Sequence, residues 1–230
     1  MKRSTFFLLF VGIHIFTPAL YAGDWFEKSD ENRLSLFSPE SESVLFDPER
    51  WTFQFGIAII TENVVDDFSV GRIDRAKGAA GGEMYLFSAS YHLYDFDWNF
   101  REWRFRPQLE LPLVFGVVNE RGRSPFFDYN AAITLRWKDF PFNRFVYTNI
   151  ESGVGLSYTD HVLATEQERH PERDRSHLKF YWPIQLMLAH PQRKEHQLVL
   201  FIHHQSGGHI FDVGGSNLIG IGYRYVFRER

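Results

Sequence analysis

Hydrophobic and polar residues alternate strictly along most of the chain from residue 51 onward. In the clearest stretch, one face carries Trp103, Phe105, Pro107, Leu109, Leu111, Leu113 and Phe115, and the other carries Glu102, Arg104, Arg106, Gln108 and Glu110. A period of two predicts β-strands, because successive side chains of a strand point to opposite faces. Eight segments share this pattern: Trp51–Ile60, Tyr85–Tyr94, Trp103–Phe115, Phe127–Trp137, Val146–Tyr158, Leu178–Leu188, Leu198–Ser206 and Asn217–Phe227.

The length of the segments favours a membrane barrel over a soluble sheet. Strands of soluble proteins average about five or six residues, whereas many of these segments run for ten or more, with aromatic residues near their ends. This pattern is typical of a transmembrane barrel, in which the apolar side faces lipid and the polar side faces the lumen. We therefore expect an all-β fold, an eight-stranded antiparallel transmembrane β-barrel over residues 51–230; a soluble sandwich or lipocalin-like barrel is the alternative.

An eight-stranded barrel has a lumen just wide enough for side chains, so a porin channel is not expected. The charged residues of the second face would fill it as a paired network. This reading places Trp103, Leu109, Leu135 and Leu186 outside, and Arg104, Arg136 and Glu151 inside.

The connections between segments alternate in length. Residues 64–82 and 159–176 form long polar connections, whereas residues 95–99, 139–144 and 190–196 form short ones. Outer-membrane barrels have long loops on the extracellular side and short turns on the periplasmic side. The last segment then runs back toward the periplasm and ends in aromatic residues, as the final strands of such barrels do.

The N-terminal part of the chain has the features of an exported protein. Lys2 and Arg3 precede an apolar run and then small residues around Ala22, so residues 1–22 are expected to be a cleaved signal peptide. Residues 23–50 alternate poorly and are read as a periplasmic N-terminal extension. Removal of the peptide would change the formal net charge from −4 to −6, which leaves no basic surface for nucleic acid. The expected location is the outer membrane of a Gram-negative bacterium.

One polar pair has no role in packing a strand. His204 and Ser206 end a column of Leu198, Leu200 and Ile202 on one face of the seventh segment. A serine nucleophile with a histidine base requires such a pair, and Asn217 lies in phase with the outward face of the next segment. The ordinary alternative is that Ser206 is a turn residue before two glycines and His204 is a solvated rim residue.

A metal site is the other alternative. His203, His204 and His209 lie close together in the sequence, with Asp212 as the nearby carboxylate. Adjacent residues of a strand point to opposite faces, which argues against a shared ion. We therefore expect no metal and no other cofactor.

These residues resemble the outer-membrane lipid A 3-O-deacylases of the PagL type, which are eight-stranded barrels with a His-x-Ser motif on the outward face of strand seven. His204-Gln205-Ser206 matches that motif, the run from Gly215 to Tyr225 is similar to the closing strand of the family, and Ile150–Gly155 is similar to its fifth strand. Two positions depart from the family. Gly207 replaces the usual Asn after the nucleophile, and Asn217 stands where the best-known form has Glu.

The resemblance implies a serine esterase that removes an ester-linked acyl chain from lipid A in the outer leaflet. Ser206 would be the nucleophile, His204 the base and Asn217 the third member of the triad, with the backbone N–H groups of Gly207 and Gly208 near the oxyanion. The expected partners are lipopolysaccharide and outer-membrane lipids, and a homodimer is left open. The alternative is a non-enzymatic small barrel that acts in surface recognition or membrane structure.

Overall fold

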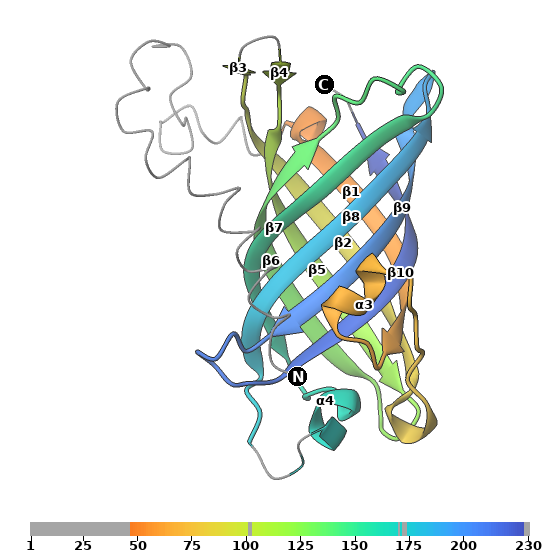
Figure 1. Ribbon diagram of the computed structural model, residues 1–230, viewed down its shortest axis with the longest axis vertical. Helices are drawn as coiled ribbons and strands as arrows, with labels where there is room; N and C mark the ends of the chain where they lie inside the picture. The colour runs from red at the N-terminus through yellow and green to blue at the C-terminus, as the bar shows by residue number, and fades with distance from the viewer. Residues whose placement is uncertain (1–46, 101–102, 170, 172–173, 228–230) are drawn as a thin grey trace. The chain divides into compact units, whose positions relative to one another are not determined.

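Eight long strands close into an antiparallel barrel in the computed structural model, which describes residues 47–100, 103–169, 171 and 174–227 (Figure 1). The order around the wall is β1, β10, β9, β8, β7, β6, β5 and β2, and β1 pairs with β10 to close it. The predicted fold class is confirmed. The strands are β1 (Trp51–Thr61), β2 (Gly82–Asp95), β5 (Gln108–Glu120), β6 (Phe126–Trp137), β7 (Tyr147–Thr159), β8 (Leu178–His190), β9 (Arg193–Ser206) and β10 (Gly215–Val226).

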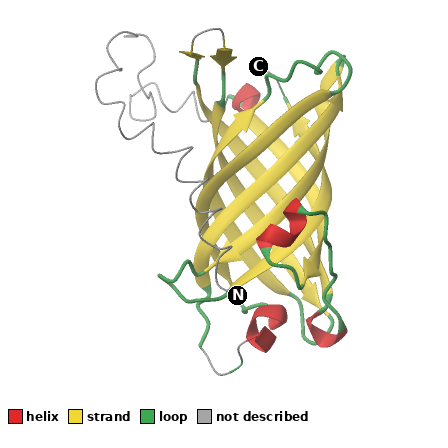
Figure 2. Ribbon diagram, viewed as in Figure 1, coloured by secondary structure: helices red, strands yellow, loops and turns green. Residues whose placement is uncertain are grey.

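Short helices occur before β1 and in the connections between strands, and none forms part of the barrel wall (Figure 2). They are η2 (Pro48–Arg50), α3 (Val65–Ser69), η3 (Gly78–Ala80) and α4 (Ala164–Arg169). Within the described residues, no helix is both long and apolar enough to cross a membrane. The signal peptide expected at residues 1–22 lies outside the described residues, as does the expected extension at 23–50 except for its last four residues.

Side chains on the outer surface of the strands are large and apolar. Exposed examples occur on all eight strands of the wall: Phe55, Ile57, Tyr85, Phe87, Leu113, Phe115, Phe127, Tyr129, Ile133, Val154, Leu156, Tyr158, Leu178, Leu198, Leu200, Ile221 and Tyr223. A surface this apolar is unfavourable in water but suits contact with lipid, and it is the outer face expected of a membrane-spanning barrel. Leu109, Leu135 and Leu186 lie on this face, as predicted.

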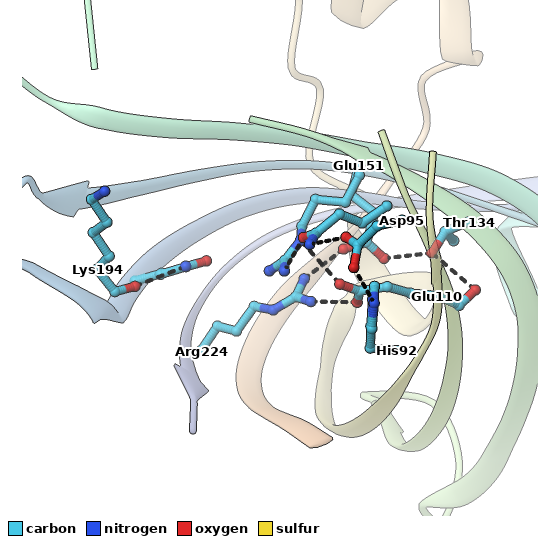
Figure 3. A network of polar contacts seen from close by, with 10 residues as sticks. His92, Asp95, Glu110, Thr134, Glu151, Lys194 and Arg224 are labelled. Carbon is cyan, nitrogen blue, oxygen red and sulfur yellow. Dashed lines mark hydrogen bonds and ion pairs between the residues drawn. The ribbon is translucent and has the colours of Figure 1, made fainter. Parts of the chain in front are cut away.

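The lumen is filled by charged and polar side chains that pair with one another. Arg224 donates from Nη2 to Glu110 Oε2 at 2.6 Å and contacts Glu151 through Nη1, while Arg136 Nε lies 3.0 Å from the other oxygen of Glu110 (Figure 3). Thr134 donates to Glu151 at 2.9 Å. Burial of charge is costly unless it is paired, so these contacts make a filled polar lumen possible. The predicted inward positions of Arg136 and Glu151 are confirmed.

The third predicted strand is corrected by the structure. Residues 103–105 do not belong to the barrel wall; they form β4 (Trp103–Phe105), which pairs with β3 (Trp98–Phe100) in a separate hairpin. The barrel strand begins only at Gln108, because Pro107 lacks the N–H that a continuous ladder needs. The connection expected to be short therefore extends over residues 96–107, and the side chains of Trp103 and Arg104 lie outside the described residues.

The two ends of the barrel differ. We call the end that carries the connections 62–81, 121–125, 160–177 and 207–214 the long-loop end. The helices α3, η3 and α4 all belong to these connections, and all three lie toward the same end in Figure 1. Strand β9 reaches this end at Ser206 and β10 leaves it at Gly215, so the predicted polar pair lies near the long-loop end.

Candidate functional site

His204 and Ser206 lie on the outer wall, as the alternation predicts. Both side chains are partly exposed. Their sequence neighbours His203 and Gln205 point to the opposite face and are buried in the lumen. His203 Nε2 lies 3.1 Å from Asp128 Oδ2, and Gln205 donates to the other oxygen of Asp128 at 2.7 Å. The two histidines therefore face opposite sides of the wall.

Asn217 lies directly opposite His204 in the pairing of β9 with β10. Its Oδ1 is 2.7 Å from His204 Nδ1, and its Nδ2 donates to the backbone carbonyl of Asn63 at 2.8 Å. A carbonyl oxygen can only accept a hydrogen bond, so the NH₂ group of Asn217 must face Asn63 and its oxygen must face the imidazole. His204 Nδ1 consequently carries the proton, and Nε2 is left with the lone pair that a general base needs.

The end of β1 and the connection that follows it pack against Asn217. Only 3% of Asn217 is exposed, and Thr61 Oγ1 donates to its backbone oxygen at 2.8 Å. Asn63 is itself held by the backbone N–H of Asp74, which donates to Asn63 Oδ1 at 2.6 Å, and its amide nitrogen contacts Asp67 and Asp74. The loop thus forms a second layer of hydrogen bonds behind the His204–Asn217 pair.

Trp182 borders His204 on the other side. It lies opposite His204 in the pairing of β8 with β9, and the two rings meet edge to face with centroids 5.8 Å apart. The indole N–H donates to Ser152 Oγ at 2.8 Å, which fixes the orientation of the ring on the outer wall. His204 is therefore enclosed laterally between Trp182 and Asn217.

Ser206 is the last residue of β9 and lies opposite Phe180 and Gly215. Its Oγ accepts a hydrogen bond from the backbone N–H of Gly208 at 3.2 Å. Within the described part of the chain, no hydrogen bond joins Ser206 to His204. On a strand, residues two apart are separated by about 6.5–7 Å between Cα atoms, a span that an extended imidazole and a rotated hydroxyl can bridge. The structure thus brings His204 and Asn217 into contact and leaves Ser206 adjacent to them.

The two glycines after Ser206 differ in what their N–H groups do. Gly207 N donates to Gly214 O at 2.9 Å within the loop, whereas Gly208 N points at Ser206 Oγ. Gly208 has a positive φ of 59°, which glycine adopts readily. Of the two expected oxyanion donors, the N–H of Gly208 is the one directed at the nucleophile.

The loop after Ser206 is fixed by a charged cluster. Asp212 Oδ2 accepts from Lys179 Nζ at 2.6 Å and from the N–H of Ser176 at 2.8 Å, and Asp212 Oδ1 accepts from the N–H of Gly214. Lys179 also donates to Glu166 of α4 at 2.7 Å. Burial alone would raise the pKa of Asp212, but the hydrogen bond from Lys179 and those from the backbone outweigh it and hold the pKa below its ordinary value.

The histidines considered for a metal site do not converge. His203 is in the lumen, His204 is on the outer wall, and His209 is exposed in the loop with a φ of 61°. In the part of the chain that the structure describes, no three histidine, aspartate or glutamate side chains are placed to share an ion.

Comparison with known proteins bears on the fold alone. No family model matches the chain, and no curated protein sequence does. The solved structure of the outer membrane enzyme PagL is similar, with a TM-score of 0.53 and 11% identity, covering 76% of this chain and 98% of that one. Neisserial surface protein A is also similar, with a TM-score of 0.45 and 12% identity, and the match covers 77% of this chain and 97% of that one. For Ail of Yersinia pestis the TM-score is 0.34 at 12% identity, and the match covers 76% of this chain and 96% of that one. The likeness to PagL and the closed eight-stranded wall show the architecture of a small outer-membrane barrel.

Proposed function

We propose that this protein is an esterase that removes an ester-linked acyl chain from lipid A in the outer leaflet. The proposal rests on one observation, the outward-facing His204 whose Nδ1 is held by Asn217, with Ser206 two residues farther along the same face. An imidazole with a fixed tautomer beside a hydroxyl is the arrangement that activates a serine nucleophile.

The location of the site favours a lipid as the substrate. His204 and Ser206 share the wall with Leu198, Leu200 and Ile202, and the wall is apolar around its whole circumference. A catalytic pair that faces away from the lumen can act only on a molecule that reaches the outside of the barrel. Lipids reach it by lateral diffusion, and lipid A supplies ester-linked chains at the long-loop end.

The reaction is acyl transfer to water. His204 Nε2 takes the proton of Ser206 as Oγ attacks the ester carbonyl, and the N–H of Gly208 donates to the oxygen that becomes negative. The imidazolium then returns the proton to the leaving alcohol, which frees the deacylated lipid. Water, activated by the same nitrogen, cleaves the acyl-serine ester and releases a fatty acid.

Asn217, the proposed third member of the triad, is neutral, which limits its role to orienting His204. Asn217 holds the imidazole in the required tautomer, but it has no charge to stabilise the imidazolium that forms during attack. The proposed enzyme would therefore depend on Asn217 for orientation alone.

The test is mass spectrometry of lipid A from cells that express the wild-type protein or the Ser206→Ala variant. We expect loss of one ester-linked acyl chain with the wild type and a fall of about 10⁴-fold or more in the deacylation rate with the variant. His177→Ala, at the same end of the barrel but bonded to Thr159 O, is the matched control and should retain activity. Heat-modifiable migration on gels checks that each variant is folded. If lipid A is unchanged by the wild type, the non-enzymatic reading replaces this one.

A further inference from the structure

The loop that follows Ser206, residues 207–214, projects sideways from the barrel wall. It leaves β9 at Ser206 and returns to β10 at Gly215. In Figure 1 it is the blue loop at the lower left, which extends beyond the outline of the wall, whereas α4 lies below the end of the barrel. Around a barrel that spans a membrane, lipid fills the space beside the strands and water fills the space beyond their ends. We call residues 207–214 the lateral loop, and its position is one where lipid is expected.

Two aliphatic side chains of the lateral loop are exposed. Ile210 is 74% exposed and Val213 is 44% exposed. The connection 121–125 at the same end of the barrel reads Arg-Gly-Arg-Ser-Pro, a composition suited to water. The acidic residue of the lateral loop, Asp212, accepts a hydrogen bond from Lys179 of β8, so its charge is paired with the barrel and not presented to the outside. An exposed apolar patch of this kind marks a surface that interacts with a protein or a membrane.

The backbone of the lateral loop is satisfied from within. The N–H groups of residues 207–211 and 214 all donate to acceptors in residues 206–214, at 2.7–3.2 Å. Gly208 and His209 have φ angles of 59° and 61°, as the two central residues of a type I′ turn do. Backbone groups that meet lipid must be bonded within the protein, because lipid supplies no partner, whereas a loop in water needs no such set of bonds. The pattern favours contact of the loop with the membrane.

The lateral loop is continuous with the lipid-facing wall. Phe180 of β8 lies opposite Ser206 and packs against Phe211 with ring centroids 5.0 Å apart. The loop backbone also lies on this ring, since a Cβ atom on Gly208 would be only 2.7 Å from a ring carbon of Phe180. An apolar surface therefore runs from the wall through Phe180 and Phe211 to Ile210.

We infer that the lateral loop is a membrane anchor, which inserts Ile210 and Val213 at the boundary between headgroups and acyl chains of the leaflet at the long-loop end. The inference goes beyond the proposed esterase function and does not depend on it. The partner is lipid and not a second protein, because two side chains supply far less than the roughly 800 Å² per partner of a stable protein interface. Apolar side chains on a polar backbone that is internally bonded suit this boundary. Ser206, at the base of the loop, is thereby held at the depth of the boundary.

Single cysteines test the depth of the loop, because the chain has none of its own. Ile210→Cys reports on the loop, Ser124→Cys in the exposed connection 121–125 is the reference for water, and Leu200→Cys on the outer wall is the reference for lipid. Each barrel is placed in phosphatidylcholine nanodiscs and treated with a sulfonated, water-soluble maleimide. Each rate is divided by that of the same variant unfolded in urea, which removes differences in intrinsic reactivity.

The expected order of rates follows the depth of each thiol. Ile210→Cys should react on the order of tenfold more slowly than Ser124→Cys, because an apolar environment disfavours the reactive thiolate. Leu200→Cys, on the wall itself, should react more slowly still. Equal rates for Ile210→Cys and Ser124→Cys would place the loop in water and overturn the inference.

A spin label on the same cysteines distinguishes lipid from protein as the cover of the loop. Oxygen concentrates among acyl chains, whereas a neutral nickel chelate stays in water. We expect the label at position 210 to be more accessible to oxygen and less accessible to the chelate than the label at position 124, as at position 200. Low accessibility to both reagents at position 210 would mean that protein, such as a second copy of the chain, covers the loop, and this result would overturn the assignment to lipid.

Discussion

The carboxamide oxygen of Asn217 accepts a hydrogen bond from His204 Nδ1 at 2.7 Å, and the two residues face each other directly across the β9–β10 pair. Because the amide nitrogen donates to Asn63 O, the orientation of the amide is set by the loop and not by the histidine. Asn217 therefore imposes a tautomer on His204 instead of adapting to one.

Replacement of Asn217 by Ala should slow deacylation by about a hundredfold, at the low end of what a correctly placed general base contributes. The imidazole would be free to place its proton on Nε2, where it cannot accept the serine proton. Asn217→Asp retains an acceptor for Nδ1 and should lose less activity than Asn217→Ala. The measurement is kcat for both variants on lipid A, with thermal unfolding as the check on folding. Equal activity of Asn217→Ala and wild type would remove Asn217 from the site and leave His204 and Ser206 as a dyad.

Replacement of Asn63 by Ala should act through Asn217, because the side chain of Asn63 holds the loop whose carbonyl binds the Asn217 amide. We expect kcat to fall by about tenfold with little change in KM, since the loss is one of positioning. Asn63→Asp keeps the acceptor for Asp74 N–H and tests whether that bond restores activity. In a double-mutant cycle, adding Asn63→Ala to Asn217→Ala should lower kcat little further. If the two losses of kcat are fully additive, Asn63 acts independently of Asn217.

The sequence predicts the barrel well because alternation is a local property of each strand. Tyr129, Ala131 and Ile133 can be assigned to the outer wall without knowledge of any partner strand. The phase of Asn217 relative to its own strand also places it beside His204, which the register confirms.

Other parts of the site depend on contacts that no local pattern encodes. Asn63 lies in an irregular loop and meets Asn217 across 154 positions of the chain. The place of Trp182 beside His204 requires the β8–β9 register. The contact of Lys179 on β8 with Asp212 likewise joins a strand to a distant loop. The β3–β4 hairpin was missed because alternation continues through Pro107 although the ladder of hydrogen bonds cannot.

Acidification should loosen the loop after Ser206. The pKa of Asp212 is held below its ordinary value, so its carboxylate contributes stability to the loop at neutral pH, and this contribution is lost as the pH falls through the lowered pKa. Asp212→Asn imitates the protonated state at pH 7, because it removes the charge that binds Lys179. We expect faster chymotrypsin cleavage after Phe211 in this variant. Asp160→Asn, in a different loop of the same end, is the control. An unchanged cleavage rate for Asp212→Asn would show that the glycines and the backbone contacts fix the loop without the carboxylate.

Removal of Arg224 should destabilise the barrel far from the proposed site. Its guanidinium, 1% exposed, pairs with both Glu110 and Glu151, so Arg224→Met leaves two carboxylates buried with incomplete compensation. Breaking a buried pair by removal of one partner costs about 3–5 kcal/mol. The free energy of unfolding, measured by urea titration in lipid vesicles, should fall by that order. Addition of Glu151→Gln should recover part of the loss, because one uncompensated charge is then removed while Thr134 retains an acceptor. If the double variant is as unstable as Arg224→Met, the cost comes from lost packing of the long side chain and not from the charge left behind.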